Sequence, residues 1–501
     1  MKFAALLLSL CGLLPLARAD EARTATAFQQ LRGEPWRLRQ FMAAFPKGGD
    51  LHNHLDGSIY AENIIGWAAA DGKCVDPATG QISLPPCDAA HPPMKDHAAD
   101  STRYSQLVDA YSVRNFERGS QSGHDQTFVT FGRFYAGTLG REPDMLREAS
   151  NRRGAENTVY LELLQSWGMG RARALAAAEP GAFAADRPAT DWARHPALAR
   201  IVAETRVELD GIEARWRELS HCGQATAEPG CGVAVRHLAQ VIRTFPPEQV
   251  NAQIALAFLL VKADPRWVGL NLVAPEDDPN TLRNYREQMA VIGALGKLYP
   301  EVQVSLHAGE FGFGLVPPED FRDHIRQALT VAGARRIGHG EAIGLEAGAF
   351  DTLRDMARRG VLVEINLTSN AIVHELKGEQ HPFGLYRQFG VPTALSADDE
   401  GVFRIDLTHE YQRAAATYPR LSYRDFKQLS RNGLAYGFVE GERLLADTAS
   451  GRFVPACAGQ RPGPEPTRPR CRELLAASSK ARLQWDLEAR FLRFEALSHA
   501  P

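Results

Sequence analysis

The chain has 501 residues, enough to bury a large core in one elaborated domain or in two modest ones. Its 44% hydrophobic and 23% charged residues are ordinary for a soluble globular protein. Lysine and arginine number 57 against 60 acidic residues, which gives a formal net charge of −3, and there is no long basic run. This balance excludes nucleic acid and anionic membranes as expected partners.

The N-terminus has the form of an export signal. Lys2 supplies the positive start, an apolar run follows over 3–16, and Ala17-Arg18-Ala19 has the small-x-small form of a cleavage site. The apolar run is too short to span a bilayer well, and no later stretch is long enough for a membrane helix. We therefore expect a signal peptide at residues 1–19 and an exported protein, periplasmic or secreted. A buried N-terminal helix is the alternative.

Of the seven cysteines, Cys11 lies in the signal and six remain. They form three pairs that are local in sequence: Cys74 with Cys87, Cys222 with Cys231, and Cys457 with Cys471. An even set of cysteines in an exported chain favours disulfides, because the export compartment is oxidising. Six cysteines allow fifteen pairings, so the local pairing is a preference, and free buried thiols are the alternative.

Short apolar runs rich in β-branched residues predict about eight strands in chain order. They lie at 49–55, 158–164, 253–261, 267–273, 302–307, 335–339, 361–367 and 392–397. Helical patterns separate most of them, for example over 280–298, 319–331 and 350–359. Strand then helix, repeated in this way, predicts an α/β protein with a (β/α)8 TIM-type barrel. A doubly wound open sheet would use the same units.

Long connections interrupt this alternation. We expect insertions near residues 70–125 and 168–245, the second with an amphipathic helix at 199–219, and a helical C-terminal tail at 475–497. Connections of this length indicate insertions on one scaffold rather than separate domains. Residues 20–501 are therefore predicted to form a single barrel domain with helical and disulfide-bearing insertions.

The ends of four predicted strands carry residues suited to metal binding or proton transfer. His52 and His54 alternate along the first strand, so their side chains point to the same side and can hold one metal ion. The other three ends carry His307 with Glu310, His339, and Asp398 with Asp399. Each residue alone has a structural explanation, such as a helix cap or a hydrogen-bonded core histidine. Together, at the strand ends where barrel enzymes keep their active sites, they favour metal-dependent chemistry.

These segments resemble the motifs of the adenosine/AMP deaminase family of the amidohydrolase superfamily, and most of all its secreted adenosine-deaminase growth-factor-like enzymes. The matching motifs run from about Lys47 to Phe403 and leave the signal, the insertions and the tail unmatched. The resemblance implies zinc-dependent hydrolytic deamination of adenosine or 2′-deoxyadenosine to inosine and ammonia, outside the cytoplasm. It also implies one Zn²⁺ per chain, whose bound water would have a pKa near neutrality.

The family pattern assigns a role to each matching residue. By this resemblance the zinc ligands are His52, His54, His307 and Asp398. His339 would hold the attacking oxygen, Asp399 would orient it, and Glu310, with a raised pKa, would protonate the purine ring nitrogen. Asp56 resembles the family residue that meets a ribose hydroxyl.

Two departures from the family pattern affect substrate fit more than metal binding. Relatives often place a glycine whose backbone meets a ring nitrogen where this chain has Ala274. In the seventh strand, Leu367-Thr368 stands before Ser369-Asn370 where relatives have Cys-Pro. The remaining histidines, among them His221, His237, His324 and His374, are expected at surface or core positions. The acidic run 276–278 is expected in a solvated loop or at a helix start.

Three hypotheses on function stay open. The first is deamination of adenosine, the second is deamination of another amino-purine (adenine or a modified nucleoside), and the third is a non-catalytic extracellular binding or signalling protein. Asp56 favours a ribose, whereas AMP is disfavoured because no cluster of basic residues adjoins the motifs. The expected partner is a small purine nucleoside, with no nucleic acid and no membrane, and the insertions offer surface for a homodimer interface or a lid.

Overall fold

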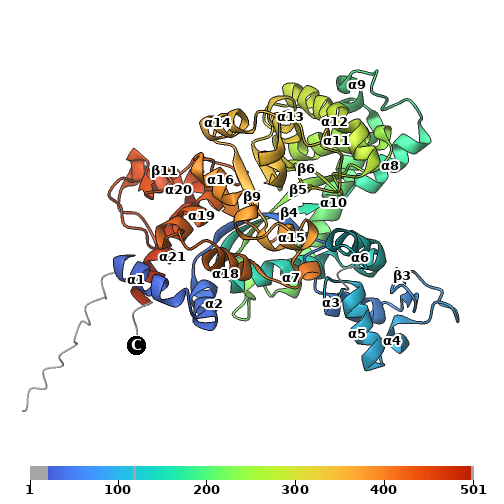
Figure 1. Cartoon of the computed structure of the whole chain (residues 1–501), viewed down its shortest axis with the longest axis horizontal. Helices are drawn as coiled ribbons and strands as arrows, with labels where there is room; N and C mark the ends of the chain where they lie inside the picture. The colour runs from blue at the N-terminus through green and yellow to red at the C-terminus, as the bar shows by residue number, and fades with distance from the viewer. Residues whose placement is uncertain (1–20, 117–119, 498–501) are drawn as a thin grey trace, which may run out of the picture.

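The computed structural model describes residues 21–116 and 120–497, so the expected signal peptide at 1–19 lies outside the described residues. Eight strands form one sheet in the order β1-β4-β5-β6-β7-β8-β9-β10, and helices surround it (Figure 1). The strands are β1 Gly48–His54, β4 Thr158–Gln165, β5 Ala234–Ile242, β6 Trp267–Val273, β7 Gln303–Ala308, β8 Arg336–His339, β9 Leu362–Ile365 and β10 Thr393–Leu395. Every neighbouring pair in this sheet is parallel.

The two outer strands of the sheet meet, so the barrel is nearly closed. Asn53 of β1 forms a parallel bridge with Asp398, just beyond β10. The Asp398 N–H donates to the His52 carbonyl at 3.0 Å, and the His54 N–H donates to the Asp398 carbonyl at 3.4 Å. The predicted (β/α)8 barrel is therefore confirmed.

One predicted strand was wrong. Residues 253–261 belong to helix α11, Pro247–Ala263, and the third barrel strand is β5, Ala234–Ile242. Helix α11 packs against β5, β6 and four helices. Its residues from 250 to 258 are therefore all buried, and the helix lacks the exposed polar side that reveals a helical period. Strand β5 lies within the insertion predicted at 168–245, so the C-terminal part of this region belongs to the barrel.

The other elements wrap this sheet or extend from it. Between barrel strands the helices are α3 Ala61–Ala70, α4 Met94–His97, α5 Ser101–Ala110, α6 Gly123–Thr138, α7 Glu142–Ala155, α8 Met169–Ala178, α9 Ala189–Ala193, α10 Pro196–Leu219, α11, α12 Pro279–Leu298, α13 His324–Thr330, α14 Ala349–Arg359, α15 Leu367–Val373 and α16 Phe383–Gln388. Those outside the strands are α1 Glu21–Leu31, α2 Pro35–Ala44, α17 Glu400–Phe403, α18 Leu407–Thr417, α19 Tyr423–Ala435, α20 Pro469–Ala477 and α21 Ser479–Leu497. Short 3-10 turns are η1 Pro229–Gly232, η2 Glu341–Leu345, η3 Gly378–Gln380 and η4 Pro455–Cys457, and two small hairpins are β2 Cys74–Val75 with β3 Ile82–Ser83 and β11 Leu445–Asp447 with β12 Arg452–Phe453.

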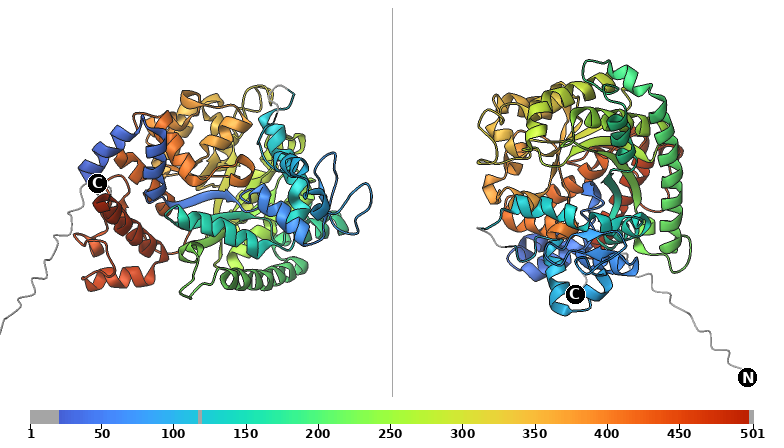
Figure 2. Two further views of the ribbon diagram at one scale, coloured as in Figure 1. Left: turned by 90° about the horizontal axis from the view of Figure 1, so that it is seen from below. Right: turned by 90° about the vertical axis from the view of Figure 1, so that its right-hand side faces the viewer.

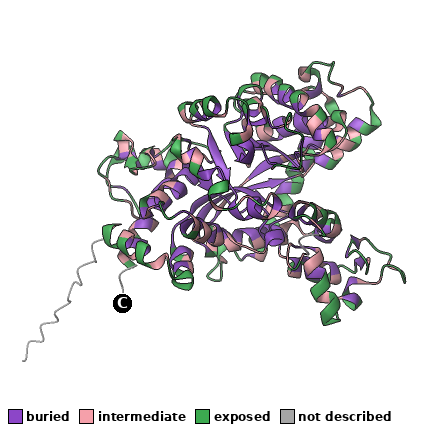
Figure 3. Ribbon diagram, viewed as in Figure 1, coloured by how far each residue is buried: buried purple, intermediate pink, exposed green. Residues whose placement is uncertain are grey.

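The core lies between the strands and the surrounding helices, where the ribbon in Figure 3 is almost wholly buried. Helices α4 and α5 and the β2–β3 hairpin, in the region predicted as the first insertion, project from the barrel in Figure 1. Helix α10 runs along the outside of the molecule in both views of Figure 2. Within residues 21–116 and 120–497 no helix is both long and apolar enough to cross a membrane.

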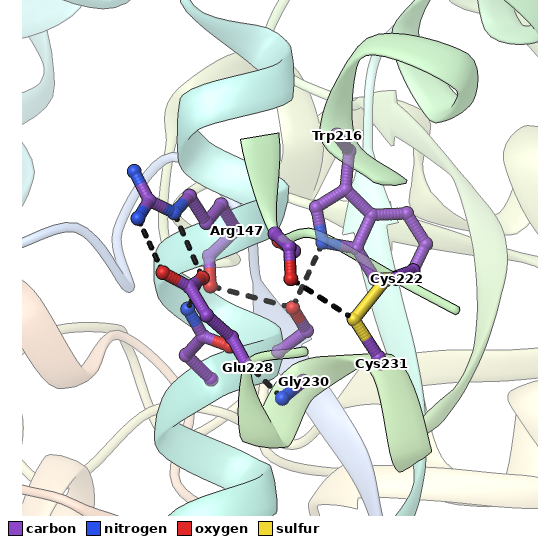
Figure 4. Close-up of a disulfide and its surroundings, with 9 residues drawn as sticks. Arg147, Trp216, Cys222, Glu228, Gly230 and Cys231 are labelled. Carbon is purple, nitrogen blue, oxygen red and sulfur yellow. Dashed lines mark hydrogen bonds and ion pairs between the residues drawn. A yellow bond between two sulfur atoms is a disulfide. The ribbon is translucent and has the colours of Figure 1, made fainter. Parts of the chain in front are cut away.

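The cysteines are bonded in the three local pairs that the sequence favours. The Cys222–Cys231 bond joins the segment after α10 to η1 (Figure 4). Beside it, Trp216 donates to Ser150 of α7 at 3.1 Å, and Arg147 of α7 pairs with Glu228. This disulfide therefore holds the end of α10 and the turn before β5 against α7.

Replacing both Cys222 and Cys231 with serine is expected to destabilise the protein by about 2–3 kcal/mol, because a short loop regains its freedom in the unfolded chain. The melting temperature should fall by a few degrees. Bound metal should stay at the wild-type amount, since the bond lies on the outside of the barrel. An unchanged melting temperature would contradict this account of the bond.

Candidate active site

The carboxyl ends of β1, β7 and β10 bring the four predicted metal ligands together. The His54 Nε2 atom lies 3.2 Å from His307 Nε2 and 3.3 Å from Asp398 Oδ1. His52 Nε2 lies 3.5 Å from the same Asp398 oxygen. All four residues are buried, and His54, at 9% exposed, is the most accessible of them. The side chains therefore face one another around a common point.

Each of the three histidines is held by an oxygen acceptor at its other ring nitrogen. The acceptors for Nδ1 of His52, His54 and His307 are Glu364 at 2.7 Å, Gln240 at 2.8 Å and Asn271 at 2.9 Å. A proton on Nδ1 leaves the Nε2 lone pair free and directed into the cluster, which is how metal-binding histidines are usually oriented.

The donor set fits a zinc ion. His52 Nε2 is buried and has no hydrogen-bond partner, a costly arrangement unless another group uses its lone pair. His52, His54 and Asp398 present ligand atoms within 4.8 Å of one another, and so do His52, His307 and His339. Three imidazole nitrogens and one carboxylate oxygen are a donor set that suits zinc.

Two glycines make room for this cluster. A Cβ atom on Gly338 would lie 2.7 Å from His52 Cε1, and one on Gly57 would lie 1.8 Å from Asp399 Oδ1. Distances this short force a shift of the side chain that is met. The chain therefore has glycine where the His52 ring and the Asp399 carboxylate approach the backbone.

Replacing Gly338 with alanine should displace the His52 ring and lower the metal content of purified protein well below one ion per chain. Metal analysis by mass spectrometry measures this directly. The matched control is Gly66→Ala on α3, where an added Cβ meets nothing within 4 Å. A full complement of metal in the Gly338 variant would show that His52 needs no such space.

Three of the predicted site residues have a strained backbone. Ala274, His339 and Asp398 have φ angles of 77°, 62° and 60°. Non-glycine residues rarely adopt this left-handed region, which costs about 1–2 kcal/mol each. Such strain is concentrated at functional sites, where the surrounding structure imposes it. At position 274 it gives a physical reason for the glycine that relatives often have there.

Replacing Ala274 with glycine should therefore stabilise the protein, by about 1 kcal/mol, because glycine adopts this φ without strain. The opposite sign is expected for Ala174→Gly in the exposed middle of α8, where glycine costs about 1 kcal/mol. Thermal unfolding of the two variants compares them. A lower melting temperature for the Ala274 variant would mean that its methyl group contributes more through packing than it costs in strain.

Glu310 and His339 face each other beside the metal ligands. His339 Nε2 lies 3.5 Å from Glu310 Oε1 and 3.9 Å from Asp398 Oδ2. Burial raises the pKa of Glu310 well above its usual value, against the opposing effect of Arg243. Burial and the neighbouring Asp398 charge likewise raise the pKa of Asp399. Burial therefore favours the protonated form of the Glu310 carboxyl group.

The expectation of a solvated acidic run at 276–278 was wrong for Glu276, which is 1% exposed. Its carboxylate accepts from the backbone N–H groups of Gly309 at 3.1 Å and Glu310 at 2.8 Å, and it also contacts His324 Nδ1. Three donors compensate the buried charge. Glu276 therefore fixes the turn that carries Glu310. His324 contacts the Glu276 carboxylate and so helps to hold it beside the site.

A buried arginine that the sequence did not single out joins two strand ends. Arg243, which follows β5, donates to the Ala274 carbonyl at 2.9 Å and to the His307 carbonyl at 3.0 Å. Its Nη2 atom lies 3.7 Å from Glu310 Oε2. The missed assignment of β5 hid it, because only an element that ends at 242 places Arg243 at the catalytic face of the barrel.

The acceptors of the three histidines were also missed, although a signal exists. Glu364 and Asn271 are single polar residues inside otherwise apolar strands, and both are fully buried. A buried polar group of this kind needs a partner. That signal predicts a hydrogen bond but does not tell which side chain receives it.

Asp56 follows β1 at the mouth of the barrel and is half-buried. Burial, together with the charge of Glu142, raises the pKa of its carboxyl group to about 6. Ala274 lies at the end of β6, on the same face of the barrel.

Histidines and carboxylates gathered at the carboxyl ends of a parallel barrel form a candidate site for metal-dependent hydrolysis. Comparison with known proteins agrees. The adenosine deaminase family model matches residues 208–447, which include β5 to β10. An adenosine deaminase of Clostridium perfringens is 29% identical over 164 residues, 32% of this chain and 44% of that protein. An N6-methyl-AMP deaminase of Danio rerio is 30% identical over 244 residues, 48% of this chain and 65% of that protein.

The matched segments thus span less than two thirds of these relatives. Among solved structures, a zinc-bound amidohydrolase from Burkholderia ambifaria superposes with a TM-score of 0.51 at 18% identity, covering 82% of this chain and 89% of that one. The Arabidopsis protein ADAL complexed with GMP superposes with a TM-score of 0.51 at 19% identity. This match covers 80% of this chain and 94% of ADAL. These structures agree on the fold. Over residues 208–447 the chain is thus similar to proteins of the adenosine deaminase family.

Proposed function

We propose that the protein is a zinc-dependent hydrolase that converts adenosine or 2′-deoxyadenosine to inosine and ammonia outside the cytoplasm. One observation carries the proposal. A buried carboxyl group with a raised pKa, Glu310, lies 3.5 Å from His339, beside the clustered side chains of His52, His54, His307 and Asp398. Both a proton donor and an activated water are needed to replace the amino group of a purine.

Each residue of the site has a separate role in the proposed reaction. His52, His54, His307 and Asp398 would hold a zinc ion, which would lower the pKa of a bound water toward neutrality. His339 and Asp399 hold and orient the attacking oxygen. Glu310 gives its proton to the ring nitrogen beside the carbon under attack, which makes that carbon electrophilic.

The water oxygen then bonds to the carbon, and the bond from this carbon to the amino group breaks. One hydrogen of the water leaves with the amino group as ammonia, and the other restores the proton that Glu310 gave to the ring nitrogen. The reaction consumes one water and needs no oxidant or reductant. Buried groups that are already in place give the electrostatic stabilisation, so little reorganisation is required during the reaction.

Replacing Glu310 with glutamine should lower kcat by about 10²–10⁴-fold, because the amide cannot supply the acidic proton. Zinc should remain bound. In the wild type the rate should persist through neutral pH and fall as the pH rises through the raised pKa of Glu310, since only the protonated form donates. An ammonia-release assay on adenosine measures both effects.

The matched control is Glu319→Gln in the exposed loop that follows, which should retain wild-type turnover. Retained activity in the Glu310 variant would remove this residue as the proton donor. Ammonia release from no purine, by protein with zinc bound, would favour the hypothesis of a non-catalytic binding protein.

The proposed location rests on the sequence of residues 1–19 and on three disulfides, which form in oxidising compartments. Mass spectrometry of the exported protein should find Asp20 as its first residue. An uncleaved N-terminus in the cytoplasm would contradict this part of the proposal.

A second candidate substrate is a nucleoside monophosphate. The guanidinium group of Arg173 lies 4.3 Å from the centre of the Phe245 ring, at the catalytic face of the barrel, and donates to Gln253 only at 3.4 Å. Most of its five donors thus stay available for an anion such as a phosphate. The similarity to an N6-methyl-AMP deaminase points the same way. The sequence alone gave no such cation beside the motifs.

A substrate panel of adenosine, 2′-deoxyadenosine, adenine, AMP and N6-methyl-AMP decides whether the substrate is a nucleoside or a nucleoside monophosphate. We expect the highest kcat/KM for adenosine or 2′-deoxyadenosine, because the half-buried Asp56 at the barrel mouth accepts from a hydroxyl and repels a phosphate. Arg173→Gln should then change kcat/KM by less than about threefold. A preference for AMP that is lost in the Arg173 variant would establish the second candidate instead.

A further inference from the structure

Behind His339, on the side away from Glu310, lies a chain of buried polar side chains to which the proposed reaction assigns no role. Asn370 of α15 places its Nδ2 atom 2.9 Å from His339 Nδ1, and the same atom also contacts Glu341 Oε1. Asn370 is fully buried, so both of its amide atoms need partners. Asn366 Nδ2 is 3.5 Å from both ring nitrogens of His339 and so favours neither of them.

The orientation of the Asn370 amide is determined by His381. The backbone N–H of Phe383 donates to His381 Nδ1 at 3.0 Å, so this nitrogen is an acceptor and carries no proton. A neutral ring then has its proton on Nε2, which donates to Asn370 Oδ1 at 2.8 Å. Burial lowers the pKa of His381 to about 3, which keeps its ring neutral.

The far side of the amide agrees with this orientation. The Glu341 carboxylate can only accept, so it requires the NH2 group of Asn370 to face it. Its second oxygen lies 2.9 Å from His374 Nδ1. One Asn370 hydrogen thus points at Glu341, and the other points at His339 Nδ1.

His339 Nδ1 must therefore accept a hydrogen bond. A proton on Nδ1 would be repelled by the Asn370 hydrogen that points at this atom. The proton of the ring is left on Nε2, the atom that faces Glu310 and Asp398.

We propose that Asn370 and His381 are positioning residues that fix His339 as the Nε2–H tautomer, so that His339 holds the attacking oxygen as a hydrogen-bond donor and does not take its proton. The inference rests on the proposed function for the identity of that oxygen. The tautomer itself follows from the hydrogen bonds alone.

The test uses the zinc-loaded protein labelled with ¹⁵N in its histidine rings, with His339→Gln to assign the signals of His339. Two-bond ¹H–¹⁵N spectra distinguish the two tautomers. We expect Nε2–H in the wild type. Asn370→Asp replaces the donor by an acceptor of the same shape, so His339 should switch to Nδ1–H.

The kinetic readout separates this role from a structural one. In Asn370→Asp, kcat for adenosine should fall by up to about 10⁴-fold, the size of effect that a wrong histidine tautomer has in a serine protease. KM should change by less than about threefold, and zinc should stay bound. A wild-type His339 with its proton on Nδ1, or an Asn370 variant with unchanged kcat, would overturn the proposal.

A second pair of variants covers the case in which Asn370→Asp does not fold. His381→Gln keeps an N–H donor near Asn370 and should preserve the Nε2–H tautomer and most of kcat. His381→Met removes the donor, so the Asn370 amide is free to flip and the His339 signals should show a mixture. Equal spectra and equal kcat in these two variants would overturn the role of His381. If no purine is turned over, the spectra still decide the tautomer, so failure of the proposed function is recognised separately.

Discussion

The contact between the first and last strands of the barrel is the constraint on which the site depends. Two backbone hydrogen bonds join Asp398 to His52 and His54, at 3.0 and 3.4 Å. They close the sheet and set three predicted metal ligands side by side. Folding of the barrel and assembly of the metal site are therefore one event, and disruption of this contact would remove both.

Burial and directional hydrogen bonds hold the histidine side chains of the site in fixed orientations. Glu364, Gln240 and Asn271 each accept from the Nδ1 atom of one histidine, whereas Asn370 places its NH2 group against Nδ1 of His339. Pre-oriented side chains lose little freedom when a metal or substrate binds. The left-handed backbone at His339 and Asp398 shows that the surrounding fold imposes these orientations against a local cost.

Much of this could be predicted from the sequence, because the ends of parallel strands share one face of a barrel. His52, His307 and Asp398 lie far apart in the chain, yet each ends a strand, and the structure brings them together. The strand at 234–242 could not be recognised, because its alanine, histidine and glutamine mask the apolar pattern. Helix α11 was mistaken for a strand because its residues from 254 to 261 form a continuous apolar run without a helical period. The partners of the histidines depend on tertiary contacts that no spacing encodes.

Anomalous diffraction at the zinc absorption edge, from crystals of protein loaded with one equivalent of zinc, tests the central claim most directly. The account predicts a single peak about 2.0–2.2 Å from the Nε2 atoms of His52, His54 and His307 and from a carboxylate oxygen of Asp398. No peak at this position, or a zinc ion bound by other residues, would contradict it.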